Sequence, residues 1–369
     1  MGKWAWKSLV AQRAWVAGSA AGIAFAFVLV IAFDAVWRGE STQIVVYIDK
    51  MSPDVWVMQR GVRNMHMATS FIWDWKSDRI ADLPGVERVT PILYLSTVVT
   101  AGDLRSFSYV VGLGPGDARA RPWELSAGRH IEDRGEAVVP EVLAKLAGVA
   151  LGDSVAIADR SLEIVGLSAG TYSSANSITF VRMEDLEDVL TSAGSYSYLL
   201  VDAEEGVDAG VLAAEIMERV EKVHAMTTED FIRSDFGMAV QMGVEIIFMM
   251  TMICLGLAAL IVGFTSYSFV MRRQKEIAVV RALGASSLAV IRVVVGQAVA
   301  TAMGGFIVAV AVAFVVLPWA PLLVPQLTLV IAPMAIAQMG LVALVVALVG
   351  ALLPAYAVSR LDPATAFQV

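Results

Sequence analysis

The chain has few residues with which to carry out chemistry. Among 369 residues there is one cysteine, Cys254, and there are three histidines, His66, His130 and His224, which lie far apart. A single cysteine excludes a disulfide framework, and the histidine spacing matches no metal-ligand motif. Neither a Gly-x-x-x-x-Gly-Lys-Ser/Thr loop nor a Gly-x-Ser-x-Gly elbow occurs. We therefore expect no catalytic residues, no metal and no resident cofactor, and a chain that does not hydrolyse ATP by itself.

Charged residues are also scarce, and they are unevenly placed. The chain is 57% hydrophobic and 17% charged, whereas soluble domains are about a quarter charged. Residues 38–235 hold 18 of the 27 Lys and Arg and 31 of the 35 Asp and Glu. This distribution predicts a soluble acidic domain joined to a membrane part with basic edges. The acidic balance argues against nucleic acid as a partner.

Long apolar runs predict four transmembrane helices, because about 20 apolar residues cross a bilayer. They cover residues 16–37, 238–270, 290–317 and 334–358. Residues 1–15 hold three cations and three tryptophans, which predicts an amphipathic helix in the headgroup layer. A cleaved signal peptide is the alternative for the first run. We disfavour it, since the run is longer than a usual signal core and no clear break precedes a cleavage site.

The placement of cations predicts the orientation of the spans. Residues 271–288 form a basic segment between the second and third spans, and Arg360 lies in the tail of residues 359–369. The loop of residues 318–333 has no charge and has four prolines. Because Lys and Arg favour the cytoplasmic side, we expect both termini in the cytoplasm of a bacterial cell and the acidic domain outside.

Residues 38–235 combine strand and helix patterns. Alternation of apolar and polar residues predicts strands at residues 43–48, 54–58, 89–100 and 107–111. Helical periods occur at 141–146, 183–190 and 211–223, and turns are expected at Gly112, Gly114, 116–117, 152–153 and Gly166. The expected fold is an α-helical membrane protein of four spans, with an α+β extracytoplasmic domain, in two lobes with an insertion near 110–200, between spans one and two.

The basic segment of residues 271–288 also predicts a short helix of its own. Residues 274–283 are good helix formers, Gly284 suits the position after the helix, and Ser286 or Ser287 can cap the next one. We predict that a cytoplasmic partner pushes on this segment through Arg272, Arg273, Lys275, Glu276, Arg281 and Gly284. The alternative is that these charges only fix the topology.

A second candidate site lies in the second span. Met238, Met242, Glu245 and Met249 recur at helical spacing, so they share one helix face. A carboxylate within a span is costly and often functional, and thioether with carboxylate could ligate a haem iron. Met65 and Met67, with His66, could add ligands. The alternative is loose methionine packing, with Glu245 reaching the surface or pairing with an arginine.

Several short motifs together resemble the MacB/FtsX-like permeases of ABC transporters. They are Ala5-Trp-Lys-Ser-Leu9, Glu136-Ala-Val-Val-Pro140, Leu151-Gly-Asp-Ser-Val155, Leu162-Glu-Ile-Val-Gly166, Glu276-Ile-Ala-Val-Val-Arg-Ala-Leu-Gly-Ala285 and Leu361-Asp-Pro-Ala364. The likeness extends over nearly the whole chain. Each motif alone is weak, but their combination is specific.

The resemblance implies a homodimer in which each subunit binds a separate cytoplasmic ABC ATPase that carries ATP and magnesium. Residues 272–285 would be the coupling segment. Closure of the ATPase would move spans one and two and the outer domain, a mode called mechanotransmission. A periplasmic adaptor and an outer-membrane channel are further partners known in this family, and the sequence does not reveal the envelope type.

Three functions are weighed. The first is efflux of an amphipathic substrate, such as haem, a lipid or lipoprotein, or a drug or peptide. The second is an FtsX-like transmitter that activates a cell-wall hydrolase, although the outer domain of such transmitters is typically much smaller. The third is a sensor subunit that signals to a kinase.

Overall fold

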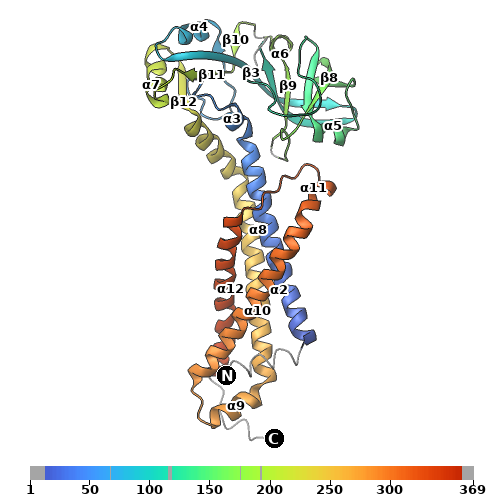
Figure 1. The fold of residues 1–369 in the computed structure, drawn as a ribbon, viewed down its shortest axis with the longest axis vertical. Coiled ribbons are helices and arrows are strands. Elements are labelled where there is room, and N and C mark those ends of the chain that lie inside the picture. The colour runs from blue at the N-terminus through green and yellow to red at the C-terminus, as the bar shows by residue number, and fades with distance from the viewer. Residues whose placement is uncertain (1–12, 67, 115–118, 175, 192, 360–369) are drawn as a thin grey trace. The chain divides into compact units, whose positions relative to one another are not determined.

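The computed structural model describes residues 13–359 except 67, 115–118, 175 and 192 (Figure 1). The described chain divides into two compact units. The helical bundle contains the residues up to Arg38, Val244–Leu323 and the residues from Leu329 onward. The α+β domain contains Gly39–Gly243 and the segment Val324–Thr328. The boundaries at residues 38/39 and 243/244 fall inside long helices, whereas Val324–Thr328 are in neither a helix nor a strand.

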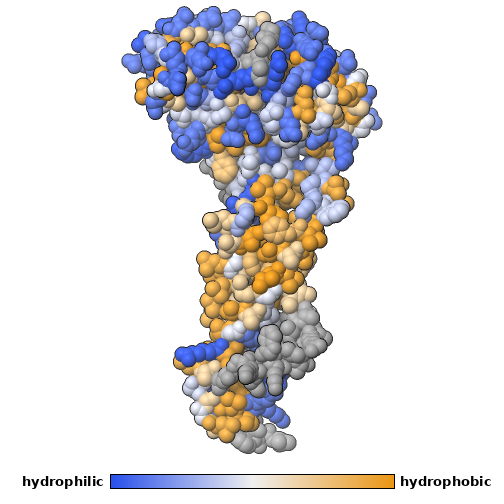
Figure 2. All heavy atoms as spheres, in the orientation of Figure 1, coloured by the Kyte–Doolittle hydropathy of each residue, from blue (hydrophilic) through white to orange (hydrophobic). Residues whose placement is uncertain are grey.

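Long apolar helices form the bundle. They are α2 (Arg13–Ile44), α8 (Thr228–Arg272), α10 (Ser287–Val316) and α12 (Pro333–Ser359), with the short α9 (Gln274–Ala282), η1 (Leu317–Trp319) and α11 (Ala320–Leu323). Among the described residues, four segments are long and apolar enough to cross a membrane: Ala20–Ile44, Met249–Arg272, Ser287–Leu323 and Pro333–Tyr356. Figure 2 shows hydrophobic side chains covering this unit, whereas the surface of the α+β domain is mostly hydrophilic.

Small residues let the bundle helices approach closely. A Cβ on Gly305 of α10 would lie 2.9 Å from Cβ of Ile23 on α2, and a Cβ on Gly263 of α8 would lie 3.2 Å from the Gly350 carbonyl oxygen of α12. Next to the first contact the rings of Phe27 and Phe306 meet edge to face at 5.5 Å. Without a hydrophobic driving force in lipid, this close van der Waals packing is what holds membrane helices together.

A mixed sheet forms the α+β domain. Its strands are β1 (Val55–Gln59), β3 (Val86–Ala101), β4 (Leu104–Leu113), β5 (Leu125–Gly128), β6 (Glu136–Pro140), β7 (Ser154–Ile157), β8 (Arg160–Ser168), β9 (Ile178–Arg182), β11 (Tyr198–Ala203) and β12 (Val223–Thr227). Within the described residues their order is β12-β1-β11-β3-β4-β9-β6-β8-β5, and β7 pairs with β3 and β8. The helices are α3 (Val46–Met51), α4 (Trp75–Ala81), α5 (Glu141–Ala147), α6 (Met183–Leu190) and α7 (Ala209–Arg219), and β2 (Ile72–Trp73) pairs with β10 (Ser195–Tyr196).

The first turns of α8 are built into the core of this domain. The ring of Phe231 is fully buried and lies 5.3 Å from that of Trp56. The Asp235 carboxylate, also buried, accepts hydrogen bonds from the backbone N–H of Met65 at 2.8 Å and contacts Nδ1 of His66 at 2.6 Å. A buried carboxylate is stable only when its oxygens have such partners. The start of α8 is therefore fixed to the domain by both packing and charge.

A second buried carboxylate begins β6. Nη1 of Arg129 donates to Oε2 of Glu136 at 2.9 Å, and the same carboxylate accepts from the backbone N–H of Glu132 and Asp133. The hydrogen bonds from Arg129 are the main reason why the pKa of Glu136 falls to about 2, because they favour the charged form. This pair stabilises the domain at neutral pH, and its contribution declines as the pH falls below about 4.5.

The expected fold class is confirmed: four candidate membrane helices, with an α+β domain between the first and the second. The strands expected at residues 54–58, 89–100 and 107–111 correspond to β1, β3 and β4. The helices expected at 141–146 and 183–190 correspond to α5 and α6. The turn at 152–153 is also present.

Other local predictions were wrong. Residues 43–48 form no strand, because α2 continues to Ile44 and α3 follows, with the apolar residues Val46, Tyr47 and Ile48 all buried. Tertiary packing here outweighs the β preference of these side chains. The helix expected at 211–223 ends at Arg219, and the chain then enters β12 at Val223.

Two glycines expected in turns lie inside strands. Gly112 is within β4 and Gly166 is within β8. A Cβ on Gly166 would overlap the Arg129 carbonyl oxygen and lie 2.9 Å from Cγ2 of Val138, so this glycine permits close backbone approach. Other predictions fall outside the described residues: most of the amphipathic helix of residues 1–15, the turn at 116–117 and nearly all of the tail.

We predict that Gly166→Ala destabilises the α+β domain by about 1–3 kcal/mol, since the added methyl group has no room. The measurement is the unfolding midpoint of the full chain in detergent, followed by limited proteolysis of the domain. Gly237→Ala is the matched control, because Gly237 is exposed on α8 and a Cβ there would meet nothing within 4 Å. Equal midpoints for the two variants would contradict the close-approach argument.

Candidate functional site

The basic segment folds into a compact corner between two spans. α8 ends at Arg272, α9 occupies Gln274–Ala282, and α10 begins at Ser287. Buried apolar residues join the three helices in one cluster: Phe269, Val270, Ile277, Val290 and Val294. The corner is therefore a packed unit in which α9 is joined to both neighbouring spans.

Two of the predicted cations hold this corner together. Arg273 is 8% exposed, its guanidinium lies over the Phe269 ring at 5.1 Å, and Nη1 lies 3.6 Å from Oε2 of Glu276. Nη2 of Arg281 donates to Oγ of Ser287 at 3.2 Å. A guanidinium can be buried in this way because it stacks on an aromatic face and pairs with a carboxylate.

The other predicted charges are accessible. Arg272, Lys275 and Glu276 are exposed. Gly284 has a φ of +97°, as its position after α9 requires, and the Oγ of Ser286 accepts from the backbone N–H of Ala289 at 3.2 Å, so both capping predictions are confirmed. The sequence therefore located the corner correctly, but it did not separate the charges that brace it from those that face outward.

The corner also exposes apolar side chains that sequence reasoning missed. Leu283 is 83% exposed, and Val279 and Leu288 are 45% and 56% exposed. Leu283 follows α9 directly. Only Ile277 and Ala278 of α9 are buried, so the segment contains more apolar residues than its packed face covers. That excess of apolar residues is the sequence feature that could have predicted exposed apolar side chains here. Leu283 and Val279 add exposed apolar surface beside the exposed charges of the same segment. We call Arg272, Lys275, Glu276, Val279 and Leu283 the coupling surface, after the role that the sequence predicts for this segment.

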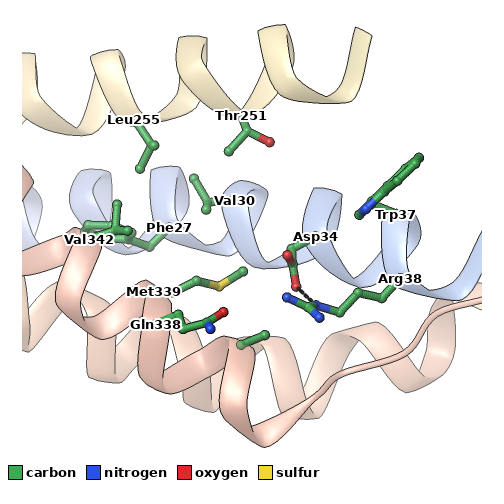
Figure 3. Close-up of a pocket in the computed structure, with 11 residues that line it drawn as sticks. Phe27, Val30, Asp34, Trp37, Arg38, Thr251, Leu255, Gln338, Met339 and Val342 are labelled. Carbon is green, nitrogen blue, oxygen red and sulfur yellow. Dashed lines mark hydrogen bonds and ion pairs between the residues drawn. The ribbon is translucent and has the colours of Figure 1, made fainter. Parts of the chain in front are cut away.

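A second feature of the bundle is a pocket between α2, α8 and α12 (Figure 3). It has a volume of about 310 Å³. Its apolar part is lined by Phe27 and Val30 of α2, Leu255 of α8, and Met339 and Val342 of α12. A volume of this size is at the lower end of small-molecule sites.

The other end of this pocket is polar. Nε of Arg38 donates to Oδ2 of Asp34 at 2.7 Å, one helical turn apart on α2. Trp37 and Thr251 line the same end, and Gln338 lies beside Met339, nearer the middle of the pocket (Figure 3). The sequence predicted that the first span ends at residue 37, whereas α2 continues unbroken to Ile44, and Asp34 and Arg38 of this helix both line the pocket.

The methionine stripe remains a prediction. Met238, Met242, Glu245 and Met249 lie in α8, but the side chains of the first three are outside the described residues. Met249 is 55% exposed. Met67 is also outside the described residues, and Met65 is buried.

His66, the third residue suggested beside the stripe, has a structural partner. Its Nδ1 contacts Asp235, and its ring meets Tyr109 edge to face at 4.7 Å. Among the described side chains, no group of three or more His, Cys, Asp and Glu is placed to hold a metal ion.

Family models match both units of the chain. The MacB-like periplasmic core domain matches residues 16–219, and the FtsX-like permease C-terminal domain matches residues 248–363. The chain therefore belongs to the MacB/FtsX-like permeases of the ABC transporter family, as the sequence motifs suggested. The coupling surface lies within the second match, and α2, with Asp34 and Arg38, lies within the first.

Curated relatives agree with this assignment over most of the chain. An uncharacterised ABC transporter permease of Mycobacterium tuberculosis H37Rv is 23% identical over 360 residues, which is 96% of this chain and 95% of the relative. A second permease from the same strain is 24% identical over 330 residues, which is 87% of this chain and 86% of the relative. A permease of Mycobacterium bovis is 23% identical over 360 residues.

Two solved structures of outer domains are similar to about half of the chain. The periplasmic region of MacB from Actinobacillus actinomycetemcomitans has a TM-score of 0.39 and 14% identity, and covers 55% of this chain and 97% of that structure. The extracellular domain of the ABC-type transporter YknZ from Gram-positive bacteria has a TM-score of 0.36 and 14% identity. The match covers 47% of this chain and 99% of that structure.

The predicted haem site is tested by titrating the purified chain with haemin and following the Soret band. If the stripe of α8 ligates haem, the band shifts, and the shift is lost in a Met242→Leu, Glu245→Gln double variant because both ligand types are removed. Met217→Leu, on an exposed methionine of α7, is the control. An unchanged haemin affinity in the double variant would remove haem from the list of substrates.

Proposed function

We propose that this chain is the membrane subunit of an ABC-type efflux system that works by mechanotransmission. A separate cytoplasmic ATPase binds the coupling surface, and its ATP-driven closure shifts the bundle between two states. The observation that carries this proposal is the corner itself: exposed Leu283, Lys275 and Glu276 stand on a unit braced from inside by Arg273. Such a surface can receive a push without deforming.

The ATPase can shift the equilibrium between two states of the bundle only if its affinity for those states differs. A rigid corner makes this possible, because its position changes with the bundle, whereas a flexible loop would adapt to the ATPase in either state. Here α9 is joined to α8 through the Phe269–Arg273 contact and to α10 through the Arg281–Ser287 hydrogen bond. Movement of α9 therefore displaces the ends of both spans together.

Three stretches of chain link the bundle to the α+β domain. Two are the helices α2 and α8, within which the boundaries fall. The third is the segment Val324–Thr328 between α11 and α12, which belongs to the domain. The Thr328 N–H donates to Oε1 of Glu40 at 3.0 Å, and Oγ of Ser174 donates to the Gln326 carbonyl at 3.2 Å. We call Val324–Thr328 the strap.

The strap supports mechanical transmission, because it gives the third and fourth spans their own connection to the domain. A movement begun at α9 then has routes through α8 and through α10 to the strap. The proposal includes a homodimer, cytoplasmic termini, an inner-membrane location and an amphipathic substrate. An adaptor and an outer-membrane channel would extend the path in a cell with two membranes.

The FtsX-like transmitter and the sensor are the alternatives. Both would use the same corner and strap, so these features do not separate them from export. The transmitter would require a cell-wall hydrolase and the sensor a kinase bound to the chain. Identifying the proteins that co-purify with the full chain from its native membrane distinguishes these outcomes.

We predict that Leu283→Asp weakens capture of a P-loop ATPase by at least about tenfold. In the proposed complex the ATPase covers Leu283, so the substitution places a charge in an apolar contact. The measurement is affinity capture of the detergent-solubilised chain with quantification of the bound ATPase. Leu146→Asp is the control, because Leu146 is also an exposed leucine but lies on α5 of the α+β domain.

A charge series refines that test. Lys275→Glu lowers ATPase capture while the chain remains folded, whereas Arg273→Glu also loosens the corner because it places a carboxylate beside Glu276. Capture that is unchanged in Leu283→Asp and Lys275→Glu would mean that the coupling surface is wrongly assigned. If no ATPase is captured with the unaltered chain, the energised-transporter proposal itself fails.

The strap generates a separate prediction. Glu40→Leu removes the acceptor of the Thr328 N–H, so hydrogen exchange of that amide increases, by roughly tenfold or more if the bond governs local opening. Glu40→Gln keeps a carbonyl acceptor and is the matched control. The measurement is hydrogen–deuterium exchange of peptides that cover residues 324–328. Similar exchange in both variants would show that Glu40 does not hold the strap.

A further inference from the structure

We propose that the pocket between α2, α8 and α12 binds an amphipathic molecule with a zwitterionic head. The apolar chain lies along Phe27, Leu255 and Val342, and the head meets Asp34 and Arg38 (Figure 3). The head carries an ammonium group that faces the Asp34 carboxylate and a phosphate or carboxylate that faces the Arg38 guanidinium. Binding needs no partner protein, but its role as cargo rests on the proposed export function.

The shape of the pocket favours an elongated ligand. Its walls come from three different helices, and most of the lining is aliphatic or aromatic. Figure 3 shows Phe27, Val342 and Leu255 toward one end and Arg38 and Trp37 toward the other, with Val30 and Met339 between them. One molecule that fills both ends must therefore be apolar along its length and polar at one terminus.

The charges select a zwitterion. Ionised side chains within a span are costly and usually mark a functional position. Asp34 and Arg38 are paired at 2.7 Å, and their side chains remain 25% and 38% exposed, so they are not sealed into the bundle. The pair has no net charge. An anionic head at Arg38 would also meet Asp34, and a cationic head at Asp34 would also meet Arg38, whereas a zwitterion satisfies both groups.

Neutral polar side chains lie near the head site. Thr251 of α8 carries a hydroxyl, and Gln338 of α12, beside Met339 in the middle of the pocket, carries both donor and acceptor atoms. Trp37 lies toward the Arg38 end, with the amphipathic ring that is enriched where hydrocarbon meets polar headgroups. The pocket therefore repeats, on a small scale, the polarity gradient of a bilayer leaflet.

The test is native mass spectrometry of the purified full chain with added lipids of identical acyl chains. Phosphatidylethanolamine, with an ammonium and a phosphate, is the zwitterionic probe, and phosphatidylglycerol is the anionic one. We expect the first to be retained over the second by about tenfold, as for one charge-assisted contact. Asp34→Asn removes the ammonium partner and should abolish that preference.

Two further variants separate binding from folding. Val342→Trp fills the apolar end without touching a charge, and it should lower retention of both lipids by about tenfold through lost space. Glu229→Gln is the matched control: it disrupts another ion pair one turn apart, Glu229–Arg233 at 2.7 Å at the start of α8, and should change nothing. If Glu229→Gln also changed lipid retention, the loss in Asp34→Asn would reflect a general effect of charge removal.

The proposal is overturned if phosphatidylglycerol is retained as well as phosphatidylethanolamine, or if Asp34→Asn and Val342→Trp both bind as the unaltered chain does. A synthetic peptide with one acyl chain and a free amino and carboxyl group is the second arm. Displacement of the phospholipid by this peptide identifies a lipidated peptide as the ligand, and no displacement identifies a membrane lipid. Leu283→Asp should bind lipid normally, so loss of ATPase capture and loss of lipid are independent outcomes.

Discussion

Buried charge at both ends of α8 is the constraint on which the rest of the structure depends. Near its start, Asp235 is held inside the α+β domain by His66 and by the backbone N–H of Met65. Directly after its last residue, Arg273 is held inside the corner by Phe269 and Glu276. An uncompensated buried charge costs several kcal/mol. The start of α8 is therefore held in the α+β domain and its end is held in the corner, so neither end can move without the residues that pack around it.

Much of the fold could be predicted from the sequence because hydrocarbon imposes simple rules. Spans must be helical and about 20 residues long, and cations gather at one side. The corner at residues 271–288 could also be predicted, because Gly284 and Ser286 are strong local signals for the end of one helix and the start of the next. The family assignment followed from several motifs in the expected order.

What could not be predicted depends on contacts between distant residues. The burial of Arg273 reverses the usual preference of arginine, and it is explained by the Phe269 ring under the guanidinium and by the nearby Glu276 carboxylate. Nothing local to Asp34 and Arg38 predicts a pocket around them. The other walls of that pocket come from Thr251 and Leu255 of α8 and from α12, which follow more than 200 residues later. The Glu40 hydrogen bond to the strap is equally remote in sequence.

The length of α8 has a consequence for how such chains can diverge. At 1.5 Å per residue its 45 residues extend over roughly 68 Å, about twice the hydrocarbon thickness of a bilayer. Inserting or deleting one residue within the helix turns everything beyond it by about 100°. Between Val262, which packs in the bundle core, and Phe269, which packs in the corner, such a change would rotate one buried face into lipid. Surface loops can therefore change in length, whereas this part of the helix tolerates only substitutions, or changes near whole numbers of turns.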